Sequence, residues 1–455
     1  MPASAFQLGP PPALAQQGGP VDAGSQAAWL EVFNGYAGVL VTSFFVTLAA
    51  TPLMRRLAIA HGIIDRPDDP RKIHKMPIAY LGGVGVYLGI MAGILYSYLA
   101  VRFGGLITPH PGADTDPGTG LPDAVPPSIV IGLSVIMLIG LLDDVAGISP
   151  RLKIAGQLFA AAALALDNVG VKVAQGLLAP TLGELLGQRE LVFQITLPLT
   201  GRFEFDLIYW TGTIIIAAFV LGACNASNLI DGLDGLLSGV TAIATLGLLA
   251  IGIMIIFTEG AAGPRDGQRI VLTLALLGAC LGFLPHNFNP ATIFLGDCGS
   301  LLLGFATIVL VLSLGDTGRT DLVIAGLIVY AIPIIDTMLA IVRRKMSGKR
   351  MSDPDSDHLH HMLKRALGVK GAVFTLYGIG ACFAVIGVLI AAGGARLAYT
   401  LAFIFAAFLM VYSTKMARMR TIERQITEAE QRSGLAPGTD PARRQHAQGP
   451  TAAEG

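Results

Sequence analysis

The chain has 455 residues, of which 53% are hydrophobic and only 14% are charged, and its mean hydropathy is +0.65. Because soluble globular proteins carry about a quarter charged residues, this composition argues against a soluble protein and favours one that folds in lipid. Lysines and arginines balance aspartates and glutamates at 31 each, which argues against a nucleic-acid-binding protein. The four cysteines are scattered without a CxxC pair, so neither a disulfide framework nor a zinc site is expected.

Apolar blocks close to the length that crosses a bilayer, about 20 residues, predict an all-α polytopic membrane protein. Residues 1–28, rich in Ala, Gly, Pro and Gln, are expected to form a disordered lead. A transmembrane domain is expected over 29–413, followed over 414–455 by a charged cytoplasmic tail that is disordered at its end. The eleven predicted spans lie near 33–54, 79–101, 127–142, 152–167, 207–224, 233–257, 269–285, 299–314, 321–342, 372–393 and 396–413.

The gaps between these spans differ in charge on the two sides of the membrane. One set of gaps, with the adjoining helix ends, holds 23 of the 31 lysines and arginines. Because Lys and Arg are retained in the cytoplasm, this set is predicted to be cytoplasmic, with the N-terminus outside and the C-terminus inside. It comprises 55–78, 143–151, 225–232, 286–298, 343–371 and the tail from 414.

The segments that are dense in Asp, Asn and His all fall on this same side. Five polar clusters on one face, separated by spans, can converge on a single site. The sequence therefore predicts a cleft at the cytoplasmic face, built from 65–77, 141–147, 225–235, 286–300 and 353–361.

The first cluster is basic and precedes a glycine-rich segment. His74 and Lys75 stand beside other basic residues that the rule of positive cytoplasmic loops explains by itself. The glycines Gly82, Gly83 and Gly85 have no preceding strand and no following GKS/T motif. They are interpreted as helix-packing residues rather than as a phosphate-binding loop.

Paired carboxylates mark the next two clusters. Asp143 and Asp144 are adjacent at a helix end, where their repulsion suits a metal or a metal-held phosphate. For an isolated pair, however, a solvated helix end is the favoured interpretation. Asp231 and Asp234 are three apart, so they are expected on one helix face, with Asn228 three residues earlier. Helix capping accounts for only one of these three. A carboxylate in an apolar segment costs about 2.5–3.5 kcal/mol, so a functional role is favoured.

The last two clusters hold an aspartate before a span and a group of histidines. Asp297, in FLGDCGS, fits a metal ligand and a helix cap equally well. His358, His360 and His361 follow three aspartates, and histidines can stabilise a transferring phosphoryl group. A polar surface loop would explain the aspartates but not three clustered histidines, and no second half of a zinc site is present. Acidic clusters at the membrane interface together predict that the protein acts on a phosphate-bearing substrate and needs Mg²⁺ to do so.

Taken in order, these motifs resemble those of the polyprenyl-phosphate N-acetylhexosamine-1-phosphate transferases. The resemblance covers about residues 60–365 and rests on RKIHKMPIAYLGG, GLLDDVAGISPRLKIAGQ, NLIDGLDGL, NPATIFLGDCGSLLLG, PIIDT and HLHH. It implies an all-α membrane bundle in the bacterial inner membrane. In that family a polyprenyl phosphate attacks the β-phosphate of a UDP-sugar and UMP leaves. The implied partners are undecaprenyl phosphate and a UDP-N-acetylhexosamine, and the implied cofactor is Mg²⁺, with Mn²⁺ as an alternative.

The resemblance also implies roles for individual residues. Asp297 would bind Mg²⁺ together with Asp143, and Asp143 and Asp144 would lie beside the lipid phosphate. The residues implied to be catalytic are Asp143, Asp144, Asp231, Asp234, His358, His360 and His361. Those implied to bind substrate are His74, Lys75, Asn228, Asn287 and Phe294.

The histidine motif indicates a branch of the family. HLHH, rather than three consecutive histidines, is similar to the branch that uses UDP-N-acetylglucosamine or a close analogue. That branch commonly has an arginine two residues before the first motif histidine, where this chain has Ser356. A direct in-line attack is favoured over a covalent aspartyl-phosphate intermediate.

Three other functions remain as alternatives. They are a phospho-N-acetylmuramoyl-pentapeptide transferase, a secondary transporter and a regulatory membrane scaffold. A transporter is disfavoured because its charges would lie near the bilayer midplane and its halves would repeat. The sequence leaves open the polysaccharide pathway that is served and the oligomeric state, a homodimer included.

Overall fold

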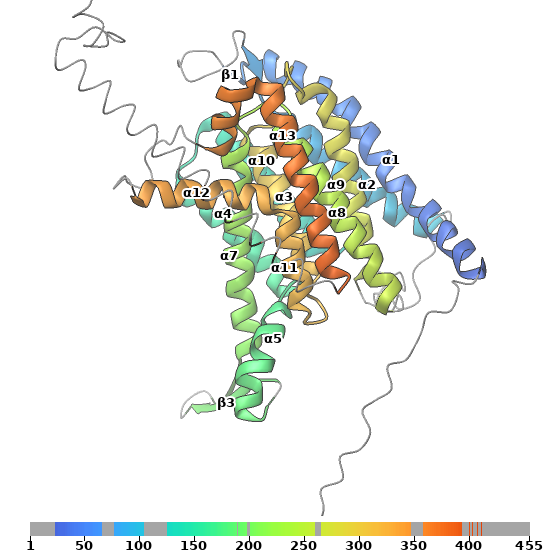
Figure 1. The fold of residues 1–455 in the computed structure, drawn as a ribbon, viewed down its shortest axis with the longest axis vertical. Helices are drawn as coiled ribbons and strands as arrows, with labels where there is room; N and C mark the ends of the chain where they lie inside the picture. The colour runs from blue at the N-terminus through green and yellow to red at the C-terminus, as the bar shows by residue number, and fades with distance from the viewer. Residues whose placement is uncertain are drawn as a thin grey trace, which may run out of the picture.

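The computed structural model describes residues 23–65, 77–103, 125–188, 190–197, 201–259, 265–346 and 358–393, with the single positions 400, 403, 407 and 411. The predicted all-α class is confirmed (Figure 1). The helices are α1 (Ala23–Ala60), α2 (Gly82–Phe103), α3 (Pro127–Ala146), α4 (Pro150–Leu166), α5 (Val173–Leu178), the π-helix η1 (Ala179–Gly183), α6 (Glu184–Leu186), α7 (Leu207–Ile230), α8 (Leu236–Glu259), α9 (Asp266–Asn287), α10 (Gly296–Ser313), α11 (Thr320–Val329), α12 (Ala331–Met346) and α13 (Leu359–Ala391).

Two small antiparallel sheets accompany the helices. The strands β1 (Ile64–Asp65) and β2 (Ile78–Ala79) pair beside the end of α1, and Ala79 also forms a parallel bridge with Ile293. The strands β3 (Val192–Leu197) and β4 (Gly201–Asp206) form a hairpin just before α7. The hairpin lies with α5 at the end of the molecule opposite β1 (Figure 1). The sequence treated 168–206 only as a gap, whereas these residues form short helices and the hairpin.

Eight helices of the described chain are long and apolar enough to cross a membrane: α1, α2, α3, α7, α8, α9, α10 and α13. The protein is therefore a multi-pass membrane protein. The predicted span at 152–167 is the helix α4, whose 17 residues are at the lower limit for crossing a bilayer. The predicted span at 396–413 lies outside the described residues apart from single positions. The number of eleven spans stays a prediction.

The predicted span at 321–342 is not a single helix. Its residues form α11 and α12, which meet at Tyr330 and are bent by 78° relative to each other. In Figure 1, α12 runs across the other helices instead of along them. The ten residues of α11 rise about 15 Å, only half the hydrocarbon thickness of about 30 Å, so the chain turns sideways partway along this segment.

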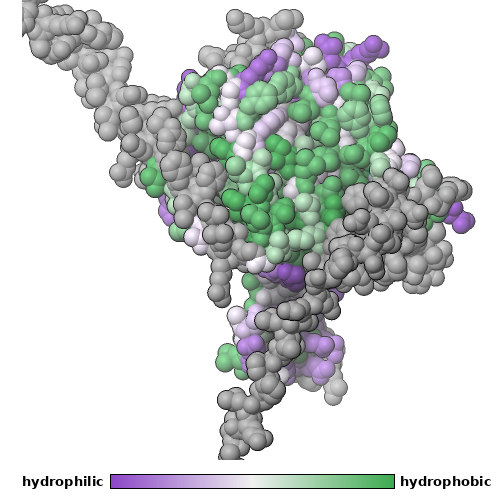
Figure 2. Space-filling view, turned by 45° about the vertical axis from the view of Figure 1, so that its right-hand side comes forward, coloured by the Kyte–Doolittle hydropathy of each residue, from purple (hydrophilic) through white to green (hydrophobic). Residues whose placement is uncertain are grey.

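The polar motifs gather at one end of the bundle. Helices α3, α7 and α9 end there, and α4, α8, α10 and α13 begin there. Figure 2 shows hydrophilic residues at the end that carries β1 and apolar surface across the middle of the bundle. The convergence that the sequence predicted is thus found for the parts of these motifs that the structure describes.

Helix α10 forms the centre of the bundle. It packs against α2, α3, α7, α8 and α9, and nearly all its side chains are buried. Close approach of α2 depends on glycine, since a Cβ at Gly83 would lie only 2.1 Å from the backbone nitrogen of Gly299. The interpretation of Gly83 as a packing residue is therefore confirmed. This contact fixes the start of α10, which carries Asp297, against the start of α2.

Candidate active site

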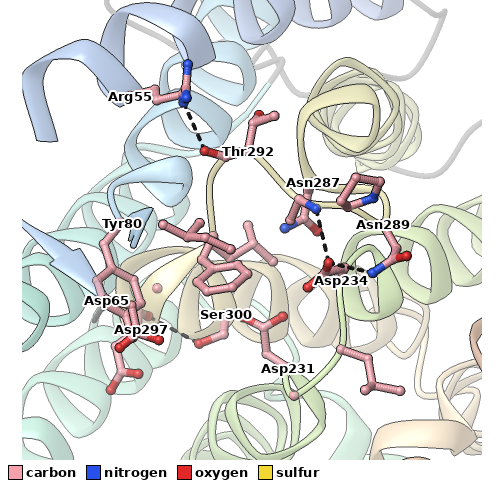
Figure 3. A pocket seen from close by; sticks show the side chains of 18 of the residues that line it. Arg55, Asp65, Tyr80, Asp231, Asp234, Asn287, Asn289, Thr292, Asp297 and Ser300 are labelled. Atoms are coloured by element: carbon pink, nitrogen blue, oxygen red, sulfur yellow. Dashed lines mark hydrogen bonds between the residues drawn. The ribbon is translucent and has the colours of Figure 1, made fainter. Parts of the chain in front are cut away.

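A pocket of about 710 Å³ opens at the polar end of the bundle (Figure 3). Its volume is within the range of ligand sites, about 300–1,000 Å³. Its walls come from the end of α1, the β1–β2 pair, the 231–234 turn, the 287–297 segment and the start of α13. Among its lining residues are Asn228, Asp231, Asp234, Asn287, Phe294, Asp297 and His361, seven of the residues predicted from the sequence.

Two predicted carboxylates and one lysine form the first part of the site. The Lys153 ammonium donates to Asp143 Oδ2 at 2.7 Å and to Asp297 Oδ2 at 2.5 Å. Asp143 Oδ1 accepts the backbone N–H of Ile148, in the turn that joins α3 to α4. Two carboxylates on different helices therefore share one cation. This is the convergence that the sequence predicted for Asp143 and Asp297.

Asp144 has a different environment from its neighbour. Its two carboxylate oxygens accept the backbone N–H groups of Asp297 at 2.7 Å and of Cys298 at 3.0 Å. These are unpaired donors in the first turn of α10, where the helix dipole also favours a negative charge. Asp144 thus anchors the start of α10 and holds Asp297 in place. From the sequence alone, this role could not be distinguished from direct contact with a phosphate.

Asn228 belongs to the same group. It lies in the last turn of α7, and its amide donates to Asp297 Oδ1 at 2.8 Å and to Ser300 Oγ at 2.9 Å. The resemblance implied that Asn228 binds substrate, whereas the structure brings it to Asp297. Helices α3, α4, α7 and α10 each contribute a polar side chain to this group.

The expectation that Asp231 and Asp234 share a helix face is wrong. Helix α7 ends at Ile230, Asp231 is its C-terminal cap, and Asp234 lies in the turn before α8. Gly235 has a positive φ of 77°, which favours glycine and interrupts the helix. The two carboxylates consequently face different parts of the pocket.

Asp231 lies in an environment that disfavours its negative charge. Desolvation in the pocket, and then the charges of Asp297, Asp144 and Asp234, raise the pKa of Asp231 to about 8. With Asp143 there are five carboxylates in this part of the structure, and two of them, Asp143 and Asp297, bind the Lys153 ammonium. This region favours an added cation.

The oxygen donors fit a magnesium ion. Mg²⁺ prefers carboxylate and water oxygens and usually takes only one or two carboxylates from the protein. Asp143 Oδ2 and Asp297 Oδ2 already converge on one cationic group, so the same pair matches that requirement. Asp144 does not, because both of its oxygens accept backbone N–H groups.

Asp234 organises the opposite side of the pocket. Its Oδ2 accepts from the Asn289 amide at 2.9 Å and from the Ala291 backbone N–H at 3.0 Å. Figure 3 shows Asp234, Asn287 and Asn289 grouped on this side. Asn287 is buried, its oxygen accepts from Gly235 N and Ser238 Oγ, and its amide donates to the Ile293 carbonyl. It therefore shapes the wall rather than presenting free polar atoms.

Aromatic and basic side chains complete the pocket. Phe294 lines it, and its ring lies 6.1 Å from that of Tyr80. Arg55 of α1 donates from Nε to the Thr292 carbonyl at 3.0 Å. The predicted residue Phe294 is thus an aromatic wall of the pocket.

The three predicted histidines lie together at the start of α13. The ring centroids of His360 and His361 are 4.3 Å apart, and those of His358 and His360 are 5.4 Å apart. His361 lines the pocket, whereas His358 and His360 are buried against Asp336 of α12. Because α12 turns aside from α11, Asp336 lies where α13 begins.

Some predicted residues cannot be placed, and others were missed. His74 and Lys75 lie outside the described residues, so their roles stay predictions. Lys153 was missed because a single lysine in a segment predicted to be cytoplasmic is explained by the charge bias of such segments alone. Asp336 was likewise given no role, although the residue stands in the PIIDT motif. A charged residue within an apolar block, which is costly in a membrane, was the available signal.

Comparison with known proteins agrees with this geometry. The glycosyl transferase family 4 model matches residues 126–315. A probable undecaprenyl-phosphate N-acetylglucosaminyl 1-phosphate transferase of Bacillus subtilis is 30% identical over 377 residues, which cover 82% of this chain and 89% of the relative. The chain belongs to glycosyl transferase family 4. The resemblance to polyprenyl-phosphate N-acetylhexosamine-1-phosphate transferases is thereby confirmed.

Two other relatives are similar over comparable lengths. A decaprenyl-phosphate N-acetylglucosaminephosphotransferase of Mycolicibacterium smegmatis is 32% identical over 341 residues, 71% of this chain and 74% of the relative. A phospho-N-acetylmuramoyl-pentapeptide-transferase of Bacillus cytotoxicus is 30% identical over 370 residues, 78% of this chain and 98% of the relative. Membership of this transferase family excludes the transporter and scaffold alternatives.

Proposed function

We propose that this protein transfers N-acetylglucosamine 1-phosphate, or a close N-acetylhexosamine 1-phosphate, from its UDP-sugar to undecaprenyl phosphate. The observation that carries the proposal is the convergence of Asp143, Lys153, Asn228 and Asp297 beside a pocket with an aromatic wall and a second acidic side. Relatives over most of the chain are named for polyprenyl-phosphate N-acetylglucosamine phosphate transfer. A site for phosphates joined to a pocket for a nucleotide suits that reaction.

The chemistry is one displacement at phosphorus. An oxygen of the lipid phosphate forms a bond to the β-phosphorus of the UDP-sugar, and the bond from that phosphorus to the oxygen bridging the α-phosphorus breaks. The products are lipid-diphospho-sugar and UMP. A phosphomonoester has a second pKa near 6, so its oxygen is largely deprotonated at neutral pH. The protein has mainly to bring two anions together in line.

We propose Mg²⁺ as the cofactor, held by Asp143 and Asp297. When bound, it would neutralise and align the phosphate oxygens. Lys153 would then supply a further positive charge beside the same phosphates, and Asn228 would keep Asp297 oriented through its amide. Asp144 would hold the start of α10 so that its N-terminal N–H groups remain fixed.

The other side of the pocket suits the nucleotide. Phe294 and Tyr80 offer aromatic faces to a base, and the turn held by Asp234 and Asn289 borders the same space. His361, at the start of α13, would donate a hydrogen bond to the diphosphate, because it lines the pocket. Asp231 lies between the two sides, so charges on either side would act on its carboxylate.

The donor separates this proposal from its nearest alternative. HLHH at 358–361 favours UDP-N-acetylglucosamine, whereas a relative of similar identity is named as a phospho-N-acetylmuramoyl-pentapeptide-transferase. We place the protein in the bacterial inner membrane with the pocket facing the cytoplasm, where basic residues concentrate. Soluble UDP-sugars would reach the site from that side.

The test is exchange of labelled UMP into UDP-sugars by the purified protein with undecaprenyl phosphate and Mg²⁺. A panel would contain UDP-N-acetylglucosamine, UDP-N-acetylgalactosamine, UDP-glucose and UDP-N-acetylmuramoyl-pentapeptide. Lipid-dependent exchange with an N-acetylhexosamine donor is expected. Preference for the pentapeptide donor would overturn the N-acetylhexosamine assignment in favour of the phospho-N-acetylmuramoyl-pentapeptide transferase. No exchange with any donor would overturn the transferase proposal.

A further inference from the structure

Asp336 is a buried carboxylate that the reaction described above leaves without a role. It lies on α12 with 1% of its surface exposed. Its Oδ1 accepts the backbone N–H of Leu359 at 2.7 Å, and its Oδ2 accepts from Nδ1 of His358 and Nδ1 of His360, each at 3.1 Å. A buried carboxylate is costly unless it is fully hydrogen-bonded, and three donors from the histidine motif meet that need.

These contacts determine the tautomer of both histidines. An ionised carboxylate only accepts hydrogen bonds, so each Nδ1 that bonds to it must carry the proton. The second ring nitrogen, Nε2, is then the one left to act elsewhere. A hydrogen bond to one ring nitrogen commonly sets the function of the other in this way.

Asp336 also fixes the start of α13. His358 precedes the helix and makes no side-chain cap of its own, whereas Leu359 is the first helical residue. The carboxylate of Asp336, from another helix, accepts the N–H of Leu359, one of the unpaired donors of the first turn. The position of the whole HLHH motif therefore depends on one side chain.

The far side of the His360 ring points toward the pocket wall. A Cβ built on Gly232 would lie only 2.6 Å from His360 Nε2, so this nitrogen abuts the turn that carries Asp231 and Asp234. Gly232 and the neighbouring His361 both line the pocket. His360 thus lies between Asp336 and the turn that forms the substrate pocket.

We propose that Asp336 is a positioning residue for the transfer reaction. It holds His358 and His360 in the Nδ1–H tautomer and directs Nε2 of His360, an acceptor in that tautomer, toward the turn that carries Asp231 and Asp234. This inference rests on the proposed function. The same three side chains have the composition of a metal site, but the hydrogen bonds account for both oxygens of Asp336 without an added ion.

The central variant is Asp336→Asn. Asparagine keeps the size but has one oxygen for three donors, and its amide would repel an Nδ1–H group. Loss of a group that orients a metal-bound histidine typically costs about 10–100-fold in activity, and we take the same factor as the guide here. We expect kcat to fall by about that factor while KM for the UDP-sugar changes by less than about twofold, the pattern of an interaction made in the transition state.

A double-mutant comparison separates positioning from structural support. In a His358→Gln/His360→Gln background no imidazole remains to be positioned, so adding Asp336→Asn is expected to cost less than about twofold more. Equal costs of Asp336→Asn in both backgrounds would overturn the proposal, as would a loss of kcat explained by loss of folded protein. If Asp336→Asn does not accumulate, Asp336→Glu serves in its place, since it keeps the charge but displaces the carboxylate.

Asp316→Asn is the matched control. Asp316 is also a buried carboxylate next to a cation, Arg265, but it lies just beyond the opposite end of α10. The Asp316→Asn substitution is expected to lower the melting temperature without changing kcat. Metal analysis of the purified parent and of Asp336→Asn completes the test. Stoichiometric zinc in the parent that is absent from the variant would show that Asp336 binds a metal and would overturn the positioning role. An inactive parent would refute the proposed function, whereas an active parent with a fully active Asp336→Asn refutes only this inference.

Discussion

Replacing Asp297 by asparagine tests the proposed magnesium site directly. In the structure Asp297 Oδ1 accepts from the Asn228 amide at 2.8 Å, and Oδ2 accepts from the Lys153 ammonium at 2.5 Å. Asparagine would keep one acceptor and replace the other with a donor, so Asn228 and Lys153 would compete for a single oxygen. The substitution removes one negative charge with almost no change in volume.

The expected loss of activity follows from the role of that charge. Removing one electrostatic group that acts on the transition state typically costs 10²–10³ in kcat, or about 2.7–4 kcal/mol. If Asp297 only stabilised the first turn of α10, the neutral residue would retain nearly full activity, because Asp144 already accepts the N–H groups of that turn.

Stability gives a second and independent measure. Without a divalent cation, the repulsion that raises the pKa of Asp231 arises partly from Asp297, so Asp297→Asn is expected to melt at the same temperature or higher. A ligand at 100 times its Kd stabilises a folded protein by about 2.7 kcal/mol. The parent is expected to gain such stability from Mg²⁺, and the variant is expected to gain much less.

The assay combines UMP exchange with melting curves in detergent over a Mg²⁺ titration. Asp321→Asn is the control, since Asp321 is also in the first turn of an apolar helix and also paired with a basic side chain, Arg319. It lies at the opposite end of the bundle, so activity and the Mg²⁺ response should be unchanged. An Asp297→Asn variant with activity within a few-fold of the parent, or with the same Mg²⁺-dependent stabilisation, would refute the assignment.

Three other measurements follow from the structure. Lys153→Gln should lower the Mg²⁺ concentration for half-maximal stabilisation by about tenfold, because a bond to a charged group is worth about 1.5–3 kcal/mol and this ammonium bonds both proposed ligands; unchanged or weaker Mg²⁺ binding would contradict this. In a Cys382→Ser background, a cysteine at exposed His61 should resist an impermeant thiol reagent in intact cells, whereas one at exposed Leu185 should react; the reverse pattern would invert the topology. Because the pKa of Asp231 is raised to about 8, the metal-free folded state binds more protons than the unfolded state between about pH 4 and 8 and loses stability as pH rises through that window. Asp231→Asn should remove this loss, and melting curves at pH 5 and pH 8 that shift equally for parent and variant would exclude it.

The sequence predicted the membrane class and most spans because a crossing helix needs a long apolar block, and these blocks are separated by polar motifs. It could not predict the bend between α11 and α12. Residues 321–342 are one apolar block up to Asp336, and Pro333 falls in the first turn of α12, where proline is tolerated. A proline in such a block does not by itself distinguish a continuous span from a broken one.

The ordered motifs identified much of the site, whereas local spacing misplaced part of it. The family motifs, rather than residue type alone, singled out Asp143 and Asp297, and the structure joins them through Lys153. The three-residue spacing of Asp231 and Asp234 implied a shared helix face, but the chain turns there. Asp336 gained its partners only from tertiary contacts with α13, which no spacing rule describes.

The segment 288–295, between α9 and α10, has a consequence for how mutations will behave. Its backbone is bonded to several distant parts of the chain: the Thr292 carbonyl to Arg55, the Phe294 N–H to the Ala79 carbonyl, and the Phe294 and Leu295 carbonyls to the N–H groups of Gly82 and Gly83. The same segment bonds to Asp234 through the Ala291 N–H and leads directly into Asp297. Any displacement of this segment would therefore move the proposed nucleotide wall and the phosphate side together, and both are bonded to α1 and α2. A substitution within this segment should disturb donor affinity and turnover together, so selective effects on either are to be sought elsewhere in the site.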